Sequence, residues 1–147
     1  YYNNPEETAK VIDSDGFFHT GDLGYVDKKG HFFISGRSKN VIVTSNGKNI
    51  YPEEIESYIL SIPYVEEVIV SAIRDDNGGE AALSAEVYLN PDKVKEIENA
   101  EIIDQLKKDI KSQCKSLPSY KQIQKVIIRD TAFNKTTTNK IKRNYAK

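Results

Sequence analysis

The apolar positions of this chain form short alternating or β-branched runs, separated by two segments with helical spacing. The runs at residues 67–73 and 82–89 flank a turn-forming Asp-Asp-Asn-Gly-Gly at 75–79, which predicts an antiparallel hairpin. Residues 125–129 predict another strand, and the β-branched run at 40–44 predicts a further one. We expect three of these four strands to form a three-stranded antiparallel sheet.

The segments between these strands carry helix signals. Pro52 and the glutamates behind it favour a helix start, because proline fits the first turn and acidic side chains complement the helix dipole. Pro63 disfavours helix before it and so ends this one. Its inward side chains are expected to be Ile55 and Ile59, with Tyr58 and Leu60 as further candidates. A second helix is expected at residues 100–115, with an apolar stripe of Ile102, Ile103, Leu106, Ile110 and Cys114.

The front of the chain differs from the rest. Residues 1–36 are rich in Gly, Asp and aromatic side chains, with turn signals at 15–16 and 28–30 and a short strand at 32–34, which predicts a β-ribbon edge. From about residue 40 the order strand, helix, strand, strand, helix, strand predicts a compact α+β domain. Short polar residues at 37–40 mark the expected boundary.

The formal net charge of −1 conceals an uneven distribution of charge. From residue 107 to the end there are 12 Lys and Arg against 2 Asp and Glu, whereas the upstream part has 9 against 20. A basic C-terminal third suits phosphate-bearing ligands, although a solvated basic face is the commoner explanation of such a run. Nucleic acid is not expected as a partner, because the basic residues are not interleaved with stacking aromatic side chains.

Several features are absent from the sequence, and their absence limits the kinds of binding site and the cellular compartment that we expect. Cys114 is the sole cysteine, which excludes an internal disulfide and a cysteine-rich zinc site, and its apolar stripe predicts a buried thiol. No cluster has metal-ligand spacing, so no metal held by this chain is expected. No apolar run reaches about 18 residues and no signal-peptide core is present, so we expect a cytoplasmic location. The chain opens on Tyr1 without a methionine, so we expect a segment of a longer protein.

The polar motif that points most directly to a ligand is Thr-Gly-Asp at residues 20–22. The Asp22 carboxylate can accept hydrogen bonds from both hydroxyls of a ribose, but an aspartate in such a turn equally satisfies its own backbone. Arg37 can donate to a sugar or a phosphate, and a surface salt bridge explains it equally well. Near the other end, Lys140 lies in the polar sequence TTTNKIKR, where a cation could meet a phosphate.

Six segments of the chain, in the same order, resemble the adenylate-forming enzymes and in particular their long-chain acyl-CoA synthetases. Three are long: DGFFHTGDLGYVD at 15–27, GHFFISGRSKNVI at 30–42 and GKNIYPEEIE at 47–56. Three are short: YNNPEET at 2–8, LPSY at 117–120 and KTTTNKI at 135–141. The resemblance covers essentially the whole chain.

The resemblance implies that residues 1–36 end a large N-terminal AMP-binding domain, that 37–40 form a hinge, and that 41–147 form the small mobile C-terminal domain. It also implies a ligase that joins a fatty acid to AMP, releases pyrophosphate and then transfers the acyl group to coenzyme A. Its ligands would be fatty acid, ATP and coenzyme A, with Mg²⁺ held mainly by ATP and by the upstream domain, the expected partner of this chain. The chain alone is expected to be inactive, because the acyl pocket and the phosphate-binding loop lie upstream. Peripheral membrane association of the whole enzyme stays open.

Carried onto matching positions, the resemblance gives Asp22 the ribose hydroxyls and Arg37 a second contact to the same nucleotide. Lys39 falls at the hinge, about which the small domain would rotate between the two half-reactions.

In one pose of this rotation Lys140 would reach the carboxylate and the α-phosphate, where an ammonium stabilises the charge that accumulates in the transition state. In the other pose the loop of Asn46, Gly47 and Lys48 would line the coenzyme A tunnel.

Lys135 and Lys142 compete with Lys140 for its role, and only the resemblance selects among the three. Two positions depart from the family pattern: Asn134 stands where many relatives have Pro, and Asn139 where many have Gly. Asparagine tolerates left-handed backbone angles, so the loop need not be disabled.

Three alternatives remain open: an acyl-carrier-protein ligase, a peptide-synthetase adenylation domain, and a non-catalytic module that binds a polyanion. A polyanion-binding module would show strongly salt-dependent binding that several tail lysines support about equally. The enzyme hypothesis instead predicts one dominant lysine.

Overall fold

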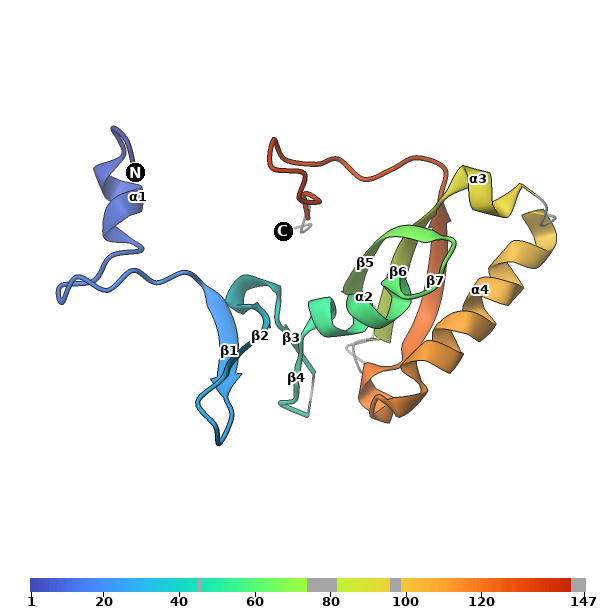
Figure 1. The fold of residues 1–147 in the computed structure, drawn as a ribbon, viewed down its shortest axis with the longest axis horizontal. Helices are drawn as coiled ribbons and strands as arrows, with labels where there is room; N and C mark the ends of the chain where they lie inside the picture. Colours follow the sequence, from blue (N-terminus) through green and yellow to red (C-terminus); the bar gives the residue numbers. More distant parts are fainter. Residues whose placement is uncertain (45, 74–81, 96–98, 144–147) are drawn as a thin grey trace. The chain divides into compact units, whose positions relative to one another are not determined.

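The structure is a computed structural model, and it describes residues 1–44, 46–73, 82–95 and 99–143. The chain divides into two compact units, Tyr1–Val41 and Ile42–Lys147 (Figure 1). The turn expected at 75–79 lies outside the described residues. The division follows Val41, next to the expected boundary at 37–40, whose role as a hinge stays a prediction.

The front unit is built on one antiparallel hairpin. Its elements are α1 (Pro5–Ala9), β1 (Asp22–Val26), β2 (Phe32–Arg37) and the short helix η1 (Ser38–Asn40). The Asp27 carboxylate accepts hydrogen bonds from the backbone N–H groups of Lys29 and His31 at 2.8 and 2.9 Å, which fixes the turn between the strands. The expected turn at 28–30 is therefore present, and the strand expected at 32–34 extends to Arg37.

The second unit contains the three-stranded sheet of β5 (Val65–Ile73), β6 (Ala82–Leu89) and β7 (Ile123–Arg129), in that order. β5 and β6 are antiparallel, as expected, but β7 runs parallel to β6. The expectation of an all-antiparallel sheet was therefore wrong. A helical connection carries the chain from the end of β6 back to the end at which β6 began, and a strand entered there must run parallel.

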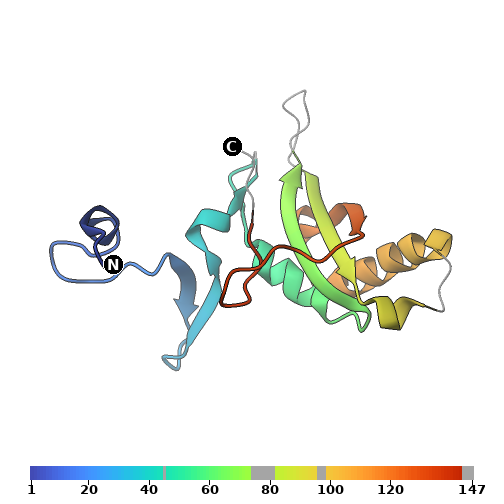
Figure 2. The same ribbon diagram turned by 90° about the horizontal axis from the view of Figure 1, so that it is seen from above.

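Two helices cover one face of this sheet, α2 (Pro52–Leu60) against β5 and α4 (Asn99–Gln113) against β7, and the two helices contact each other (Figure 2). Both form where the sequence predicted them, and Pro52 opens α2 as expected. The remaining elements are the small hairpin of β3 (Ile42–Val43) and β4 (Asn49–Ile50), then α3 (Pro91–Val94), η2 (Cys114–Ser116) and η3 (Ser119–Lys121).

The core lies between the sheet and these helices. Ile55 and Ile59 of α2 are fully buried and Tyr58 is partly buried, but Leu60 is 47 % exposed, so its expected inward position was wrong. Leu60 is the last residue of α2. Its side chain projects from a different side of the helix than the buried side chains of Ile55 and Ile59. Cys114 is buried, and burial raises the pKa of its thiol.

Candidate functional site

The Thr-Gly-Asp motif forms the entry to β1. Asp22 begins that strand and lies directly opposite Arg37, which ends β2. Arg37 Nε contacts Asp22 Oδ1 at 2.8 Å, and Arg37 Nη1 donates to the Thr20 carbonyl at 2.8 Å. Gly21 has a φ of 74°, in the left-handed region that favours glycine, and this conformation lets the chain turn into the strand. The hairpin thus brings the two predicted nucleotide-binding side chains together.

The predicted hinge residue, Lys39, lies in η1 at the end of the front unit. Its side chain is exposed, and η1 begins with a hydrogen bond from the Ser38 N–H to the Gly21 carbonyl at 2.9 Å. The short helix therefore extends the β1–β2 hairpin up to the division between the two units.

The tail around Lys140 forms a closed loop. The Thr136 N–H donates to the Lys140 carbonyl at 2.8 Å, the Lys142 N–H donates to the Asn134 carbonyl at 2.7 Å, and Lys135 pairs with Ile141 as an isolated antiparallel bridge. Asn139 has a φ of 61°, so asparagine takes the left-handed conformation just before the lysine. The hydrogen bond between Thr136 and Lys140 closes the turn of residues 137–139 and so fixes the backbone of the exposed Lys140.

The three tail lysines have different surroundings. Lys135 forms an ion pair with the buried Glu67, and this hydrogen bond raises the pKa of the Lys135 ammonium. The side chains of Lys140 and Lys142 are exposed and have no ion-pair or hydrogen-bond partner within the described part of the chain. Lys135 is therefore occupied by a structural contact, whereas the ammonium groups of Lys140 and Lys142 are both exposed, so the choice of Lys140 over Lys142 stays a prediction.

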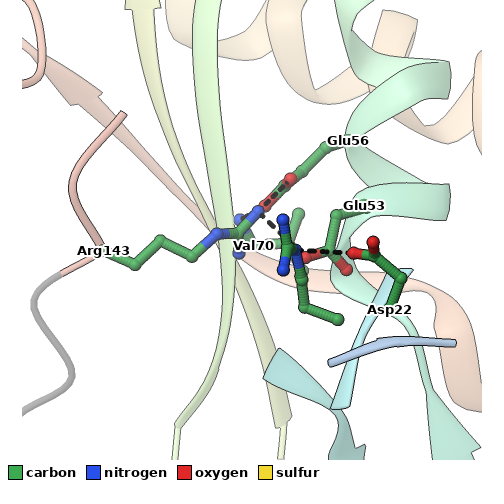
Figure 3. A network of polar contacts seen from close by, with 6 residues as sticks. Asp22, Glu53, Glu56, Val70 and Arg143 are labelled. Atoms are coloured by element: carbon green, nitrogen blue, oxygen red, sulfur yellow. Dashed lines mark hydrogen bonds and ion pairs between the residues drawn. The ribbon is translucent and has the colours of Figure 1, made fainter. Parts of the chain in front are cut away.

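Two buried glutamates that the sequence analysis did not single out hold this tail. Glu67 Oε2 accepts the Phe133 N–H at 2.7 Å, while Glu56 Oε1 accepts the Val70 N–H at 2.7 Å and its Oε2 contacts Arg143 (Figure 3). Burial raises the pKa of the Glu56 carboxyl, although the Val70 N–H and the Arg143 guanidinium both act to lower it. In the sequence, Glu56 is recognisable only as one of the acidic residues near the predicted helix start. This local feature does not predict its contacts with Val70 and Arg143.

The predicted coenzyme A loop is the turn between β3 and β4. Gly47 has a φ of 72°, and the Thr44 hydroxyl accepts the Lys48 N–H at 3.0 Å, which closes the turn. The Lys48 ammonium lies 4.4 Å from the centre of the Tyr120 ring. Asn46 and Lys48 line a pocket of about 500 Å³ together with Thr44, Ala82, Ser119, Tyr120 and Gln124. Gly47 shapes the turn but does not line this pocket.

In the described ranges no group of three or more His, Cys, Asp or Glu side chains could hold a metal ion. No helix in the same part of the chain is both long and apolar enough to cross a membrane.

The sequence and the fold are similar to known proteins. The family model described as AMP-binding enzyme C-terminal domain matches residues 54–140. The long-chain-fatty-acid–CoA ligase FadD13 of Mycobacterium tuberculosis is 45 % identical over 82 residues, which are 56 % of this chain and 16 % of that protein.

Two solved structures resemble nearly the whole chain. ATP-bound MatB from Rhodopseudomonas palustris has 34 % identity and a TM-score of 0.66, over 96 % of this chain and 26 % of that one. The A domain of carboxylic acid reductase from Segniliparus rugosus, in complex with AMP and a co-purified carboxylic acid, has 26 % identity and a TM-score of 0.82, over 97 % and 23 %. The chain thus spans about a quarter or less of the length of these relatives.

Proposed function

The chain belongs to the AMP-binding enzyme C-terminal domain family, and from that premise we propose that it is the C-terminal portion of an ATP-dependent long-chain fatty acid–CoA ligase. The enzyme would join the fatty acid carboxylate to AMP with release of pyrophosphate. The thiol of coenzyme A would then attack the acyl-adenylate and displace AMP.

The observation that carries this proposal is the closed tail loop, in which the exposed Lys140 lies directly after the turn of residues 137–139. The loop fixes the backbone on both sides of the lysine and leaves the ammonium without an internal partner in the described part of the chain. A preorganised cation of this kind stabilises negative charge on the carboxylate and the α-phosphate as they react. The relatives named above support the reaction class: one is named as a fatty acid–CoA ligase and one was solved with AMP and a carboxylic acid.

The front hairpin supports the nucleotide half of the proposal. An ionised carboxylate has about four lone-pair positions, so the contact with Arg37 Nε leaves Asp22 able to accept from ribose hydroxyls. The same contact orients the carboxylate, and the half-exposed guanidinium of Arg37 keeps donors for the nucleotide.

For the second half-reaction we assign the β3–β4 turn to coenzyme A. The pocket beside it offers the amide of Asn46, the ammonium of Lys48 and the Tyr120 ring, a combination suited to a chain that carries both amide and phosphate groups. A rotation about Lys39 would exchange the Lys140 loop for this turn, and a few backbone torsions at the end of η1 can absorb such a change.

Mg²⁺ would accompany ATP in this reaction, and its ligands would be the phosphates and residues upstream of this chain. Because the described residues offer no group of three carboxylate, histidine or cysteine side chains, no step of the reaction is assigned to a metal held here.

The test is carboxylate-dependent exchange between ATP and pyrophosphate by the full-length enzyme that carries this chain, with acids from acetate to palmitate. We expect exchange that is fastest with long-chain acids and that falls by on the order of 10²–10³ in Lys140→Ala, the usual cost of removing a preorganised donor. Lys142→Ala, an exposed lysine two residues away, is the matched control and should exchange nearly normally. A folded wild-type enzyme that exchanges with no acid would leave the polyanion-binding module as the better hypothesis.

A further inference from the structure

The Lys140 loop has two ends, and each end is fastened to the body of the second unit. The loop closes where the Lys142 N–H donates to the Asn134 carbonyl, at 2.7 Å. Phe133 and Arg143 flank this closure, and Lys135 follows it as the second residue of the loop. These three residues contact Glu67 of β5 or the glutamates of α2.

At the first end both oxygens of one carboxylate bind the tail. Glu67 Oε2 accepts the Phe133 N–H at 2.7 Å, and Glu67 Oε1 pairs with the Lys135 ammonium. The Glu67 side chain is only 5 % exposed. Side chains alternate along β5, so Glu67 lies on the face opposite to the buried Val68 and therefore away from the helices.

At the second end one carboxylate joins three parts of the fold. Glu56 of α2 accepts the N–H of Val70 at the free edge of β5, and its other oxygen pairs with Arg143 from the tail (Figure 3). Glu53, one turn earlier on α2, lies 3.8 Å from the same guanidinium. The tail thus passes around the edge of β5, held first by Glu67 and then by Glu56.

Burial makes both contacts selective for one position of the tail. A buried carboxylate is unfavourable unless it is paired and hydrogen-bonded. A tail that moved away would leave Glu67 without Phe133 and Lys135, and would leave Glu56 with the Val70 N–H but without Arg143. An exposed lysine on an unanchored tail would instead sample many positions. A catalytic cation is effective only when it is held where charge develops.

We propose that Glu56 and Glu67 are positioning residues that clamp the two ends of the 134–142 loop and thereby hold Lys140 for the adenylation step. This inference rests on the proposed function of Lys140. Neither glutamate touches the reacting groups, since both act through the tail residues that they bind.

The test uses the full-length enzyme with Glu67→Gln and Arg143→Met, each alone and each combined with Lys140→Ala. Glutamine keeps an acceptor for the Phe133 N–H but loses the charge that holds Lys135. Methionine replaces Arg143 with an unbranched apolar side chain that has neither the charge nor the guanidinium donors. We expect adenylation kcat to fall by roughly 10- to 100-fold with KM for ATP and acid unchanged, because a displacement of about 1 Å can cost on the order of 10² in rate. In the Lys140→Ala background the same changes should add nothing.

Three controls separate positioning from general damage. Thioester formation from preformed acyl-adenylate, which does not use Lys140, should keep its wild-type rate in both variants. Arg143→Lys should restore most of the adenylation rate, and Glu101→Gln on the exposed face of α4 should behave as wild type. If Arg143→Met does not fold, Glu67→Gln carries the same comparison, because it preserves the shape of the side chain.

The outcomes distinguish the two proposals. Normal adenylation in the clamp variants, beside a large loss in Lys140→Ala, overturns the clamp and keeps the proposed function. A loss of equal size in both half-reactions, or one that persists in the Lys140→Ala background, also overturns the clamp. Absence of adenylation by the folded wild-type enzyme removes the proposed function, and the clamp with it.

Discussion

The front hairpin and the tail of the second unit both pair a carboxylate with an arginine, but in opposite surroundings. The Asp22 and Arg37 side chains are 31 % and 50 % exposed, whereas Glu56 and Arg143 are 9 % and 18 % exposed. Exposed pairs contribute about 0–1 kcal/mol to stability, while breaking a buried pair costs about 3–5 kcal/mol. The exposed pair is therefore accessible from solvent, whereas the buried pair is a structural contact between α2 and the tail.

The largest expected effect comes from breaking the buried pair. Glu56→Ala removes the nearer carboxylate partner of Arg143, leaving Glu53 at 3.8 Å, and it also removes the acceptor of the Val70 N–H. It should lower the free energy of unfolding by about 3–5 kcal/mol. Urea unfolding of the chain, followed by circular dichroism, measures this. Glu101→Ala, on the exposed face of α4, is the control and should change stability by less than about 0.5 kcal/mol. A loss below about 1 kcal/mol for Glu56→Ala would mean that the Glu56–Arg143 pair contributes no more to stability than an exposed ion pair does.

The front hairpin should be sensitive to backbone geometry more than to its ion pair. A Cβ at Gly24 would lie 2.3 Å from the Phe33 carbonyl oxygen of the facing strand, beside the bulge in the β1–β2 register. Gly24→Ala should therefore destabilise the hairpin by about 1–3 kcal/mol, the usual cost of forcing extra volume into a packed site.

Hydrogen exchange of the β1 and β2 amides reports this change. Lys28→Ala, in the exposed turn of the same hairpin, is the matched control and should leave the exchange rates unchanged. Wild-type protection in Gly24→Ala would show that the hairpin relaxes around the new methyl group.

Within the second unit, the elements differ in how far the sequence predicted them. The α2 helix and the β6 strand were predicted from local signals, namely Pro52 with its glutamates and the apolar alternation of residues 82–89. The parallel pairing of β7 was not, because its direction depends on how the connection through α4 returns along the sheet. Residue propensity and hydrophobic periodicity describe residues that are close in sequence. The direction of a strand in its sheet instead depends on the tertiary structure.

The same limit applies to the candidate site. Asp22 and Arg37 both belong to recognisable motifs, and one hairpin brings them together. Glu56 and Arg143 are 87 residues apart, and Glu67 is 66 residues from Phe133, so no local pattern links them. A glutamate at a helix start has a sufficient local explanation in the helix dipole, and this explanation concealed its role in holding the tail.

Breaking the exposed Asp22–Arg37 pair is expected to have a smaller effect on stability than breaking the buried pair, and a larger effect on ligand binding than on stability. Asp22→Ala should change the free energy of unfolding by less than about 1 kcal/mol, because both side chains remain solvated when they separate. In the full-length enzyme the same change should weaken AMP binding by on the order of 10-fold or more, since hydrogen bonds to a charged group contribute about 1.5–3 kcal/mol.

Calorimetric titration with AMP measures the binding, and Asp15→Ala is the matched control, an exposed aspartate of the same unit. Unchanged AMP affinity in Asp22→Ala would make the pair a surface salt bridge and nothing more. A large loss of stability would instead show that exposure is a poor guide to what this pair does.

The smallest expected effect is the response of the β1–β2 turn to acid. The backbone N–H of His31, followed by the His31 side chain, lowers the pKa of the Asp27 carboxyl below its usual range. A carboxyl whose pKa is lowered by folding stabilises the folded form above its ordinary pKa and loses this contribution as pH falls through the lowered value. The turn should therefore loosen only below about pH 4, where Asp27 takes up its proton.

The amide resonances of Lys29 and His31, which donate to Asp27, report this transition in an NMR titration. Asp27→Asn keeps one acceptor oxygen and removes the titration, so its two amide shifts should stay flat over the same range. Glu56 supplies the opposite case within the chain, because burial raises the pKa of its carboxyl and its contribution declines as pH rises through that value. If the pKa values of Asp27 and Glu56 proved to be shifted in the same direction from their ordinary values, burial would not be what distinguishes the two regions.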